Sequence, residues 1–250
     1  MDNSDATLPL MLKQLRLSEV RTHWVALAEK AINEGWTPPQ YLAELCHIEL
    51  LNRDDKRLQR HRKEATLPKG KQLGHFDFAA IEGVSKAQIT QLIDTVAWTK
   101  TGDNLLLFGA SGIGKTHLAS AIGCGLVEAG IRVKFSSASA LVQHLQKAKQ
   151  DFRLEDALLK LDKFAVLILD DIVYIRKTDH ETGVPFELIA HRYERHSLII
   201  TSNQSFEDWD QLFNDTVMTV AAIDRLVHHA KIIQCKGDSY RRKTLLQNSQ

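Results

Sequence analysis

Apolar residues in the first 70 positions recur every three or four residues, which is the spacing of helices that bury one face. Gly35 favours a left-handed cap that would end one helix, and Thr37 with Gln40 has the pattern of a capping box that would begin the next. We therefore expect a small all-helical domain over residues 1–70. Its three helices are expected over residues 8–15, 18–35 and 37–64.

Residues 71–250 have a different rhythm, because short apolar runs alternate there with longer amphipathic stretches. Such alternation is typical of an α/β domain, in which a mainly parallel sheet is covered by helices on both faces. The strands are expected at Asn104–Phe108, Arg132–Ser136, Phe164–Asp170, Ser197–Thr201 and Lys231–Gln234.

Composition changes this picture little. The 250 residues carry a formal net charge of +1, so total charge neither supports nor excludes a nucleic-acid partner. No apolar run approaches the roughly 20 residues that span a bilayer, and the acidic start MDNSDATLPL does not have the pattern of a signal peptide. The three cysteines show no C-x-x-C spacing. We expect a cytoplasmic protein.

Local basic patches are more informative than total charge. Five cations share one face of the third expected helix, namely Arg53, Lys56, Arg57, Arg60 and Lys63. This face is either a solvated charged surface or a contact for the phosphate backbone of DNA, whose binding would then depend on salt. A second candidate DNA surface comprises Lys134, Lys147, Lys149 and Arg153.

The stretch GASGIGKT follows an expected strand and precedes an expected helix, and it fits the pattern G-x-x-x-x-G-K-[ST]. In that context the backbone N–H groups and the helix N-terminus bind phosphates. Lys115 would reach the β- and γ-phosphates of ATP, and the hydroxyl of Thr116 would bind Mg²⁺. The expected nucleotide-binding residues are Gly109, Ala110, Ser111, Gly112, Ile113, Gly114, Lys115, Thr116 and His117.

Two further apolar strands end in polar residues. In FAVLILDD, Asp170 is placed to hold the Mg²⁺ ion and Asp171 to orient or deprotonate the attacking water. Asp171 is one methylene shorter than the glutamate usual at this place in ATPases, so we expect ATP hydrolysis to be slow or dependent on assembly. In SLIITSN, Asn203 either binds the water or the γ-phosphate, or belongs to a simple turn.

The remaining polar candidates are arginines and histidines. Arg225 in AAIDRLVHHA and Arg241 in DSYRRK are candidates for an arginine finger, with a surface ion pair as the alternative for each. His228 and His229 look like a metal-binding pair. Adjacent residues on a helix point away from each other, however, so we expect these two to be packing or surface residues.

Longer runs make the sequence similar to one family. Five runs resemble the IstB family of insertion-sequence helper ATPases. They are NLLLFGASGIGKTHLASAIG, VLILDD, FELIAHRYERHSLIITSNQSFEDW, MTVAAIDRLVHHA and DSYR. This branch of the AAA+ proteins is close to the DnaC and DnaI helicase loaders. LRLSEVRTHW and YLAELCHIEL extend the resemblance into the helical region, so that it covers nearly the whole chain.

The resemblance implies an AAA+ sheet in which the strand carrying Asn203 lies between those carrying the phosphate loop and Asp170. It implies that Asn203 is the first sensor and that Arg225 is the finger, acting on a neighbour's nucleotide in a homo-oligomer with ATP sites between subunits. The partners it implies are duplex DNA, which is deformed, and a transposase. The helical domain would serve self-assembly and contacts with DNA or a partner.

The sequence departs from the family pattern in two places. Residues 172–176 replace a typical Gly and Tyr-Val-Pro, and Pro185 stands where relatives carry leucine in a helix. Because proline is tolerated only in the first turn, we expect this helix to begin near Thr182 or Gly183. Only about sixteen residues follow the last expected strand, which is too few for a C-terminal lid domain.

The leading hypothesis is therefore an ATP-dependent, DNA-binding ATPase that delivers target DNA to a transposase. A replicative helicase loader is the alternative within the same fold, and it would use the helical domain to grip a helicase. A nucleotide-gated scaffold without turnover is a third reading, because Asp171 is short. No acceptor pocket for a small-molecule kinase is indicated.

Overall fold

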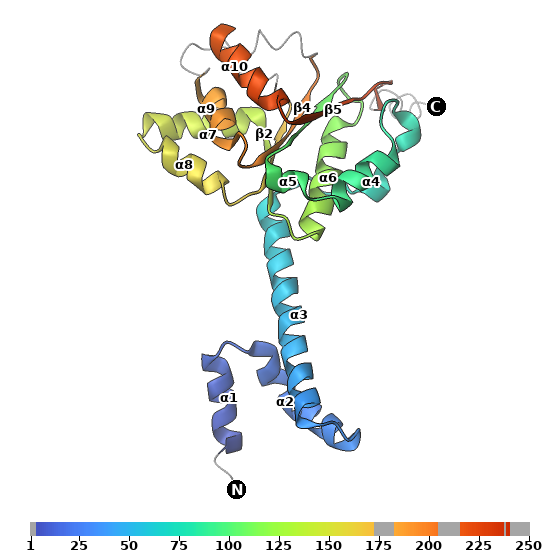
Figure 1. The fold of residues 1–250 in the computed structure, drawn as a ribbon, viewed down its shortest axis with the longest axis vertical. Coiled ribbons are helices and arrows are strands. Elements are labelled where there is room, and N and C mark those ends of the chain that lie inside the picture. Colours follow the sequence, from blue (N-terminus) through green and yellow to red (C-terminus); the bar gives the residue numbers. More distant parts are fainter. Residues whose placement is uncertain (1–3, 173–182, 205–215, 238, 241–250) are drawn as a thin grey trace, which may run out of the picture. The chain divides into compact units, whose positions relative to one another are not determined.

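A computed structural model of the chain describes residues 4–172, 183–204, 216–237 and 239–240 (Figure 1). It divides into two compact units, residues 1–60 and 61–250. The sequence placed a boundary near residue 70, whereas this division lies within a helix that continues past residue 60.

The first unit contains the three expected helices, α1 (Ser4–Gln14), α2 (Ser18–Asn33) and most of α3 (Pro38–Ala65). Gly35 has a φ of 66°, and the N–H of Thr37 donates to Oε1 of Gln40 at 2.7 Å, so both expected helix boundaries are confirmed. A small core joins the helices. It is formed by Leu12, Val20 and Leu45, with Leu8, Leu17, Trp24, Leu27, Tyr41 and Ile48 packed against them.

The second unit is built on a five-stranded sheet in which every pairing of neighbouring strands is parallel. The strand order is β2-β3-β4-β1-β5, so β4 lies between β1 and β3 as the sequence predicted. The expected strands differ from the observed ones by only a few residues at their ends. Their bounds are β1 Asn104–Phe108, β2 Val133–Ser137, β3 Val166–Asp170, β4 Ser197–Ser202 and β5 Ala230–Gln234.

Helices cover both faces of the sheet (Figure 1). One face packs on α7 (Ala138–Gln150), α8 (Leu154–Leu161), α9 (Gly183–Arg192) and α10 (Thr216–Val227). The other face packs on α6 (Lys115–Glu128), which approaches closely because a Cβ at Gly123 would lie 2.7 Å from Cδ1 of Ile168. The remaining helices are α4 (Lys86–Asp94), α5 (Trp98–Thr101) and the 3-10 turns Leu73–His75 and Phe78–Ala80.

Among the described residues α9 begins at Gly183, directly after residues 173–182, which lie outside them, so the expected start near Thr182 or Gly183 stays a prediction. In the helix as described, Pro185 lies in the first turn, where proline costs no helical hydrogen bond. At the other end of α9, the Arg192 side chain is fully buried. It donates to the carbonyls of Leu161, Phe164, Ala165 and Ser197, and burial lowers its pKa to about 10.

Asn104, at the start of β1, joins this strand to its neighbours and to α10. Its Nδ2 donates to the carbonyl of Leu226 at 3.1 Å, and its Oδ1 accepts from the N–H of Leu198 at 2.9 Å. Its own N–H donates to the carbonyl of His229 at 2.8 Å. A single buried amide therefore ties together β1, β4 and the end of α10.

Candidate functional site

The stretch GASGIGKT connects the end of β1 to the start of α6, as the sequence predicted. At Gly109 a Cβ atom would lie 2.3 Å from the carbonyl oxygen of Cys235, so a side chain has no room there. Gly114 has a φ of 108°, in the region that favours glycine. Nζ of Lys115 donates to the carbonyls of Gly109 and Ala110 at 2.7 and 2.9 Å, which closes the loop around a buried lysine.

The carboxylate of Asp170, at the end of β3, lies beside the start of α6. Its Oδ2 accepts from Oγ1 of Thr116 at 3.1 Å. Its Oδ1 accepts from Oγ1 of Thr201 at 2.8 Å. These contacts follow from the strand order, because β4 lies between the strand that leads into the phosphate loop and the strand that ends in Asp170.

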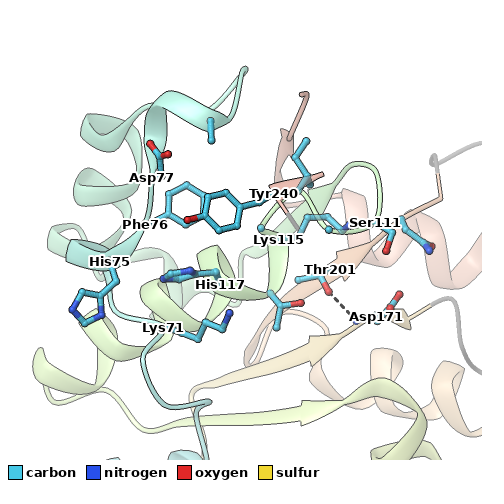
Figure 2. Close-up of a pocket in the computed structure, with 16 residues that line it drawn as sticks. Lys71, His75, Phe76, Asp77, Ser111, Lys115, His117, Asp171, Thr201 and Tyr240 are labelled. Atoms are coloured by element: carbon cyan, nitrogen blue, oxygen red, sulfur yellow. Dashed lines mark hydrogen bonds between the residues drawn. The ribbon is translucent and has the colours of Figure 1, made fainter. Parts of the chain in front are cut away.

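The backbone at Asp171 is held in an uncommon conformation. Its φ is 60°, in the left-handed region that aspartate enters more readily than most residues. Its N–H donates to Oγ1 of Thr201 at 2.8 Å (Figure 2). Because Oγ1 of Thr201 also donates to Asp170, this one hydroxyl contacts both residues of the Asp170-Asp171 pair. Asn203 is exposed just beyond β4 and lines the same cavity as Asp171.

Thr201 is a site residue that the sequence analysis missed. It is 1% exposed at the end of an otherwise apolar strand, and that position was the available signal. A hydroxyl buried there must find hydrogen-bond partners, and Asp170 and Asp171 at the end of the neighbouring strand β3 supply them.

These residues surround a cavity of about 270 Å³. Residues 111–117 of the loop and α6 line one side of it, and Asp171, Thr201 and Asn203 also line it. Further lining comes from two segments that the sequence analysis did not assign. These are Lys71, His75, Phe76, Asp77 and Ala80 before the sheet, and Tyr240 after it.

Phe76, His117 and Tyr240 form the aromatic part of the cavity (Figure 2). The ring of Phe76 meets those of Phe78 and His117 edge to face, with centroids 4.8 and 5.2 Å apart. Nε2 of His117 lies 3.1 Å from the carbonyl of Gln72, and burial lowers the pKa of this histidine. The N–H of Tyr240 donates to the carbonyl of Gly112 at 3.1 Å, which fixes Tyr240 against the phosphate loop.

The two arginine candidates have different positions. Arg225 is on α10, as expected, and its guanidinium lies 5.2 Å from the centre of the Phe186 ring. Nη1 donates to the carbonyl of Ala221 at 3.3 Å. Arg225 is not among the described residues that line the nucleotide-sized cavity of its own chain. Arg241 lies outside the described residues, as do Val173, Tyr174, Ile175 and Arg176.

The candidate DNA-binding cations differ in how they are held. Arg53 donates through Nε to Oε1 of the buried Glu49 at 3.0 Å, and through Nη2 to the carbonyl of Arg16. Arg57 pairs with Asp54 at 3.2 Å. Lys56, Arg60 and Lys63 are exposed on the same helix.

In the second candidate DNA surface, two of the four cations bind other groups of the protein. Nζ of Lys134 donates to the carbonyl of Glu64 at 3.2 Å, and Lys149 pairs with Glu187 at 2.6 Å. Lys147 and Arg153 are exposed. Arg53 and Lys134 therefore contribute to the structure itself, whatever else they bind.

In the part of the chain that the structure describes, no helix combines the length and the apolar character needed to cross a membrane.

Known protein structures share this fold. The crystal structure of the DnaC helicase loader has a TM-score of 0.55 and 20% identity, covering 67% of this chain and 98% of that one. The crystal structure of DnaI has a TM-score of 0.56 and 20% identity, covering 68% and 95%. The expected α/β fold, a parallel sheet between layers of helices, is thereby confirmed.

Sequence relatives identify the family. A protein of Sinorhizobium fredii named as an insertion sequence ATP-binding protein is 48% identical over 243 residues, which are 97% of this chain and 82% of that protein. The insertion sequence IS21 ATP-binding protein of Pseudomonas aeruginosa is 37% identical over 236 residues, 94% and 89% of the two chains. The family model of the IstB-like ATP binding proteins matches residues 10–248. This chain belongs to the IstB-like ATP binding protein family.

Proposed function

We propose that this protein hydrolyses ATP with Mg²⁺ and uses ATP to assemble on duplex DNA, which it deforms and delivers to a transposase. The observation that carries the proposal is the cluster of Thr116, Asp170, Thr201 and Asp171 beside the phosphate loop. Family membership supports ATP binding, and the cluster supplies the groups that hydrolysis needs in addition.

The phosphate loop would bind the β- and γ-phosphates through its N–H groups and the N-terminus of α6. Lys115 already lies at the loop, with its ammonium group on the carbonyls of Gly109 and Ala110. A phosphate oxygen is a stronger partner for an ammonium group than a neutral carbonyl, so Lys115 would turn to the nucleotide.

The Thr116 hydroxyl and the Asp170 carboxylate fit a magnesium ion. Their oxygens are 3.1 Å apart, and oxygen atoms are the ligands that Mg²⁺ prefers. When bound, Mg²⁺ neutralises charge on the β- and γ-phosphates. Thr201 would keep Asp170 turned toward Thr116 by holding the other carboxylate oxygen.

Asp171 would accept a proton from the attacking water, with Asn203 orienting that water. Both residues line the cavity, on the side of Thr201. The aspartate side chain reaches one methylene less far than glutamate, so slow turnover follows unless assembly or DNA brings the parts together.

Assembly is proposed because the cavity lacks an arginine from the described part of its own chain. Transferred phosphoryl groups are commonly stabilised by an arginine from a neighbouring subunit. Arg225, on α10 and away from its own cavity, would act on the nucleotide of a neighbour in a homo-oligomer. Arg241 remains a second candidate.

The named relatives favour transposition over helicase loading. Relatives from insertion sequences are 48% and 37% identical over nearly the whole chain. The helicase loaders DnaC and DnaI are 20% identical, a level at which only the fold is shared. A helicase-loading role is therefore the second candidate.

Replacing Asp171 with asparagine tests the proposed hydrolysis. We expect steady-state ATP turnover, measured with and without duplex DNA, to fall by about 10²- to 10⁴-fold, because the general base is lost. ATP binding should persist, and Asp94→Asn, at an exposed position on α4, should behave as the unmodified protein does. Unchanged turnover in Asp171→Asn would remove this residue from catalysis, whereas absence of turnover in the unmodified protein would favour a non-hydrolysing scaffold.

Salt dependence tests the DNA surface. We expect the triple change Lys56→Gln, Arg57→Gln and Arg60→Gln to reduce the slope of log affinity against log salt by about 2.7, at about 0.9 for each lost phosphate contact. Arg53 is left in place because it binds the buried Glu49. The matched triple change Lys147→Gln, Lys149→Gln and Arg153→Gln examines the second surface. If the salt slope is unchanged in the first variant, this face of α3 is a solvated charged surface and does not contact DNA.

A further inference from the structure

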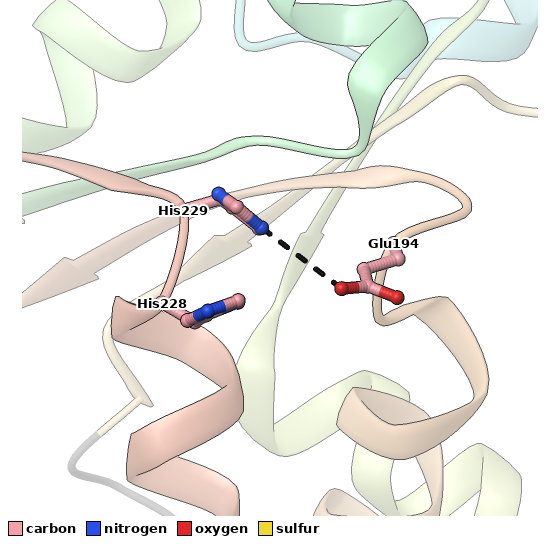
Figure 3. A group of neighbouring side chains, drawn as sticks. All are labelled: Glu194, His228 and His229. Atoms are coloured by element: carbon pink, nitrogen blue, oxygen red, sulfur yellow. Dashed lines mark ion pairs between the residues drawn. The ribbon is translucent and has the colours of Figure 1, made fainter.

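Three possible metal ligands lie together outside the nucleotide cavity. Glu194 follows α9, and His228 and His229 follow α10 (Figure 3). One ligand atom from each residue lies within 4.8 Å of the other two. Nε2 of His229 is 3.9 Å from Oε1 of Glu194, and the two imidazole ring centres are 4.1 Å apart.

His228 and His229 are exposed, as expected of surface residues, but the rule that adjacent residues on a helix point apart does not apply to them. It holds for neighbours inside a helix, but α10 ends at Val227, and both histidines lie in the turn that leads into β5. The change of backbone direction after the helix lets both rings lie on the same side.

The backbone of this group is fixed to regular elements. The carbonyl of His229 accepts from the N–H of Asn104 at the start of β1, and the N–H of His228 donates to the carbonyl of Asp224 in α10. Glu194 has a left-handed φ of 56°, two residues after the end of α9. The side chains are exposed, so they can move to a ligand while the main chain stays in place.

A neighbouring phenol orients one of the ligands. The hydroxyl of Tyr193 lies 2.9 Å from Nδ1 of His228, which leaves Nε2 of this ring available. Histidines that bind metals usually engage their second ring nitrogen in such a hydrogen bond.

We propose that Glu194, His228 and His229 bind one zinc ion. Two imidazole nitrogens and a carboxylate oxygen form a ligand set that Zn²⁺ accepts, with a water molecule in the fourth position. Zn–N distances of about 2.0–2.1 Å require ligand atoms roughly 3.3 Å apart in a tetrahedron. Closing the group from within 4.8 Å to that spacing is a small movement for exposed side chains. His228 and His229 also line a cavity of about 430 Å³, which gives access to solvent.

This zinc site is separate from the proposed magnesium site in position and in chemistry. The phosphate loop follows the carboxyl end of β1, whereas His229 contacts the first residue of that strand. Thr116 and Asp170 offer only oxygen atoms, whereas this group offers imidazole nitrogens, which suit zinc better than magnesium. A zinc ion here would join the end of α9 to the end of α10.

Calorimetric titration of the full-length, chelator-treated protein with ZnCl₂ tests the proposal. We expect one zinc ion per chain, and at least tenfold weaker binding in His229→Ala and in Glu194→Gln. His144→Ala, which removes an exposed histidine on α7, is the matched control and should bind as the unmodified protein does. Thermal unfolding without zinc establishes that each variant is folded.

Zinc should also raise the thermal unfolding midpoint of the unmodified protein and of His144→Ala, because an ion that binds only the folded state stabilises it. The two site variants should not show this rise. The proposal is overturned if the unmodified protein does not bind zinc, or if both site variants bind it with unchanged affinity, which would place the ion on other residues such as the exposed Cys46.

Discussion

Replacing Lys115 with alanine is expected to weaken ATP binding by roughly 10- to 150-fold, which corresponds to the loss of a charged hydrogen bond of about 1.5–3 kcal/mol. The ammonium group of the buried Lys115 lies on the loop carbonyls, and Lys115 lines the cavity proposed to hold the phosphates. Assembly that depends on ATP should be lost at nucleotide concentrations that saturate the unmodified protein. Equilibrium titration with a fluorescent ATP analogue measures the affinity.

The control for this change is Lys100→Ala, at an exposed position on α5 outside the cavity, which should leave the affinity unaltered. Because Lys115 also closes the loop, the thermal unfolding midpoint of Lys115→Ala should be recorded. A folded Lys115→Ala protein that binds ATP normally would contradict the assignment of this lysine to the phosphates.

Replacing Thr201 with valine is expected to lower ATP turnover by about 10- to 100-fold, the loss seen when a group that orients a metal ligand is removed. Valine has nearly the shape of threonine but lacks the hydroxyl that holds both Oδ1 of Asp170 and the N–H of Asp171. Without it Asp170 can rotate, and the left-handed backbone at Asp171 loses a hydrogen bond. The affinity for ATP should change little, because Thr201 does not belong to the phosphate loop.

Thr201→Ser separates positioning from packing. Serine keeps the hydroxyl and loses a methyl group in a buried position, so turnover should recover while the unfolding midpoint falls. Valine has the opposite effect, keeping the volume and losing the hydrogen bonds. If valine and serine lower turnover equally, packing at this position matters and the hydroxyl does not position Asp170 and Asp171.

The fold could be predicted from the sequence because its strands are nearly uninterrupted apolar runs. Leu105, Leu106 and Leu107 are buried from both faces, and so are the equivalent residues of β3 and β4. Helix boundaries at Gly35 and Thr37 were also predictable, since glycine and capping residues restrict the backbone locally. These features depend on a few neighbouring residues only.

The site could be predicted only where a residue belongs to a local pattern. Lys115, Thr116 and Asp170 were found in that way, whereas Thr201 becomes important only through the order of the strands. Tyr240 was missed for a similar reason, because it follows β5 in the sequence and meets Gly112 only in the folded chain. The histidine pair shows the converse error, in which a correct rule for helices was applied beyond the end of one.

In the proposed oligomer, Asn104 would link successive ATP sites, because it joins the strand that leads to the phosphate loop with the helix that carries Arg225. The strand that begins at Asn104 ends at the phosphate loop, and the side chain of Asn104 holds the carbonyl of Leu226 beside Arg225. In the proposed assembly, the loop serves the nucleotide of its own subunit and Arg225 serves the next one. In that proposed assembly, the five-residue strand β1 would couple the nucleotide bound by one subunit to hydrolysis in its neighbour, and a ring or filament of such subunits would transmit nucleotide state along its length.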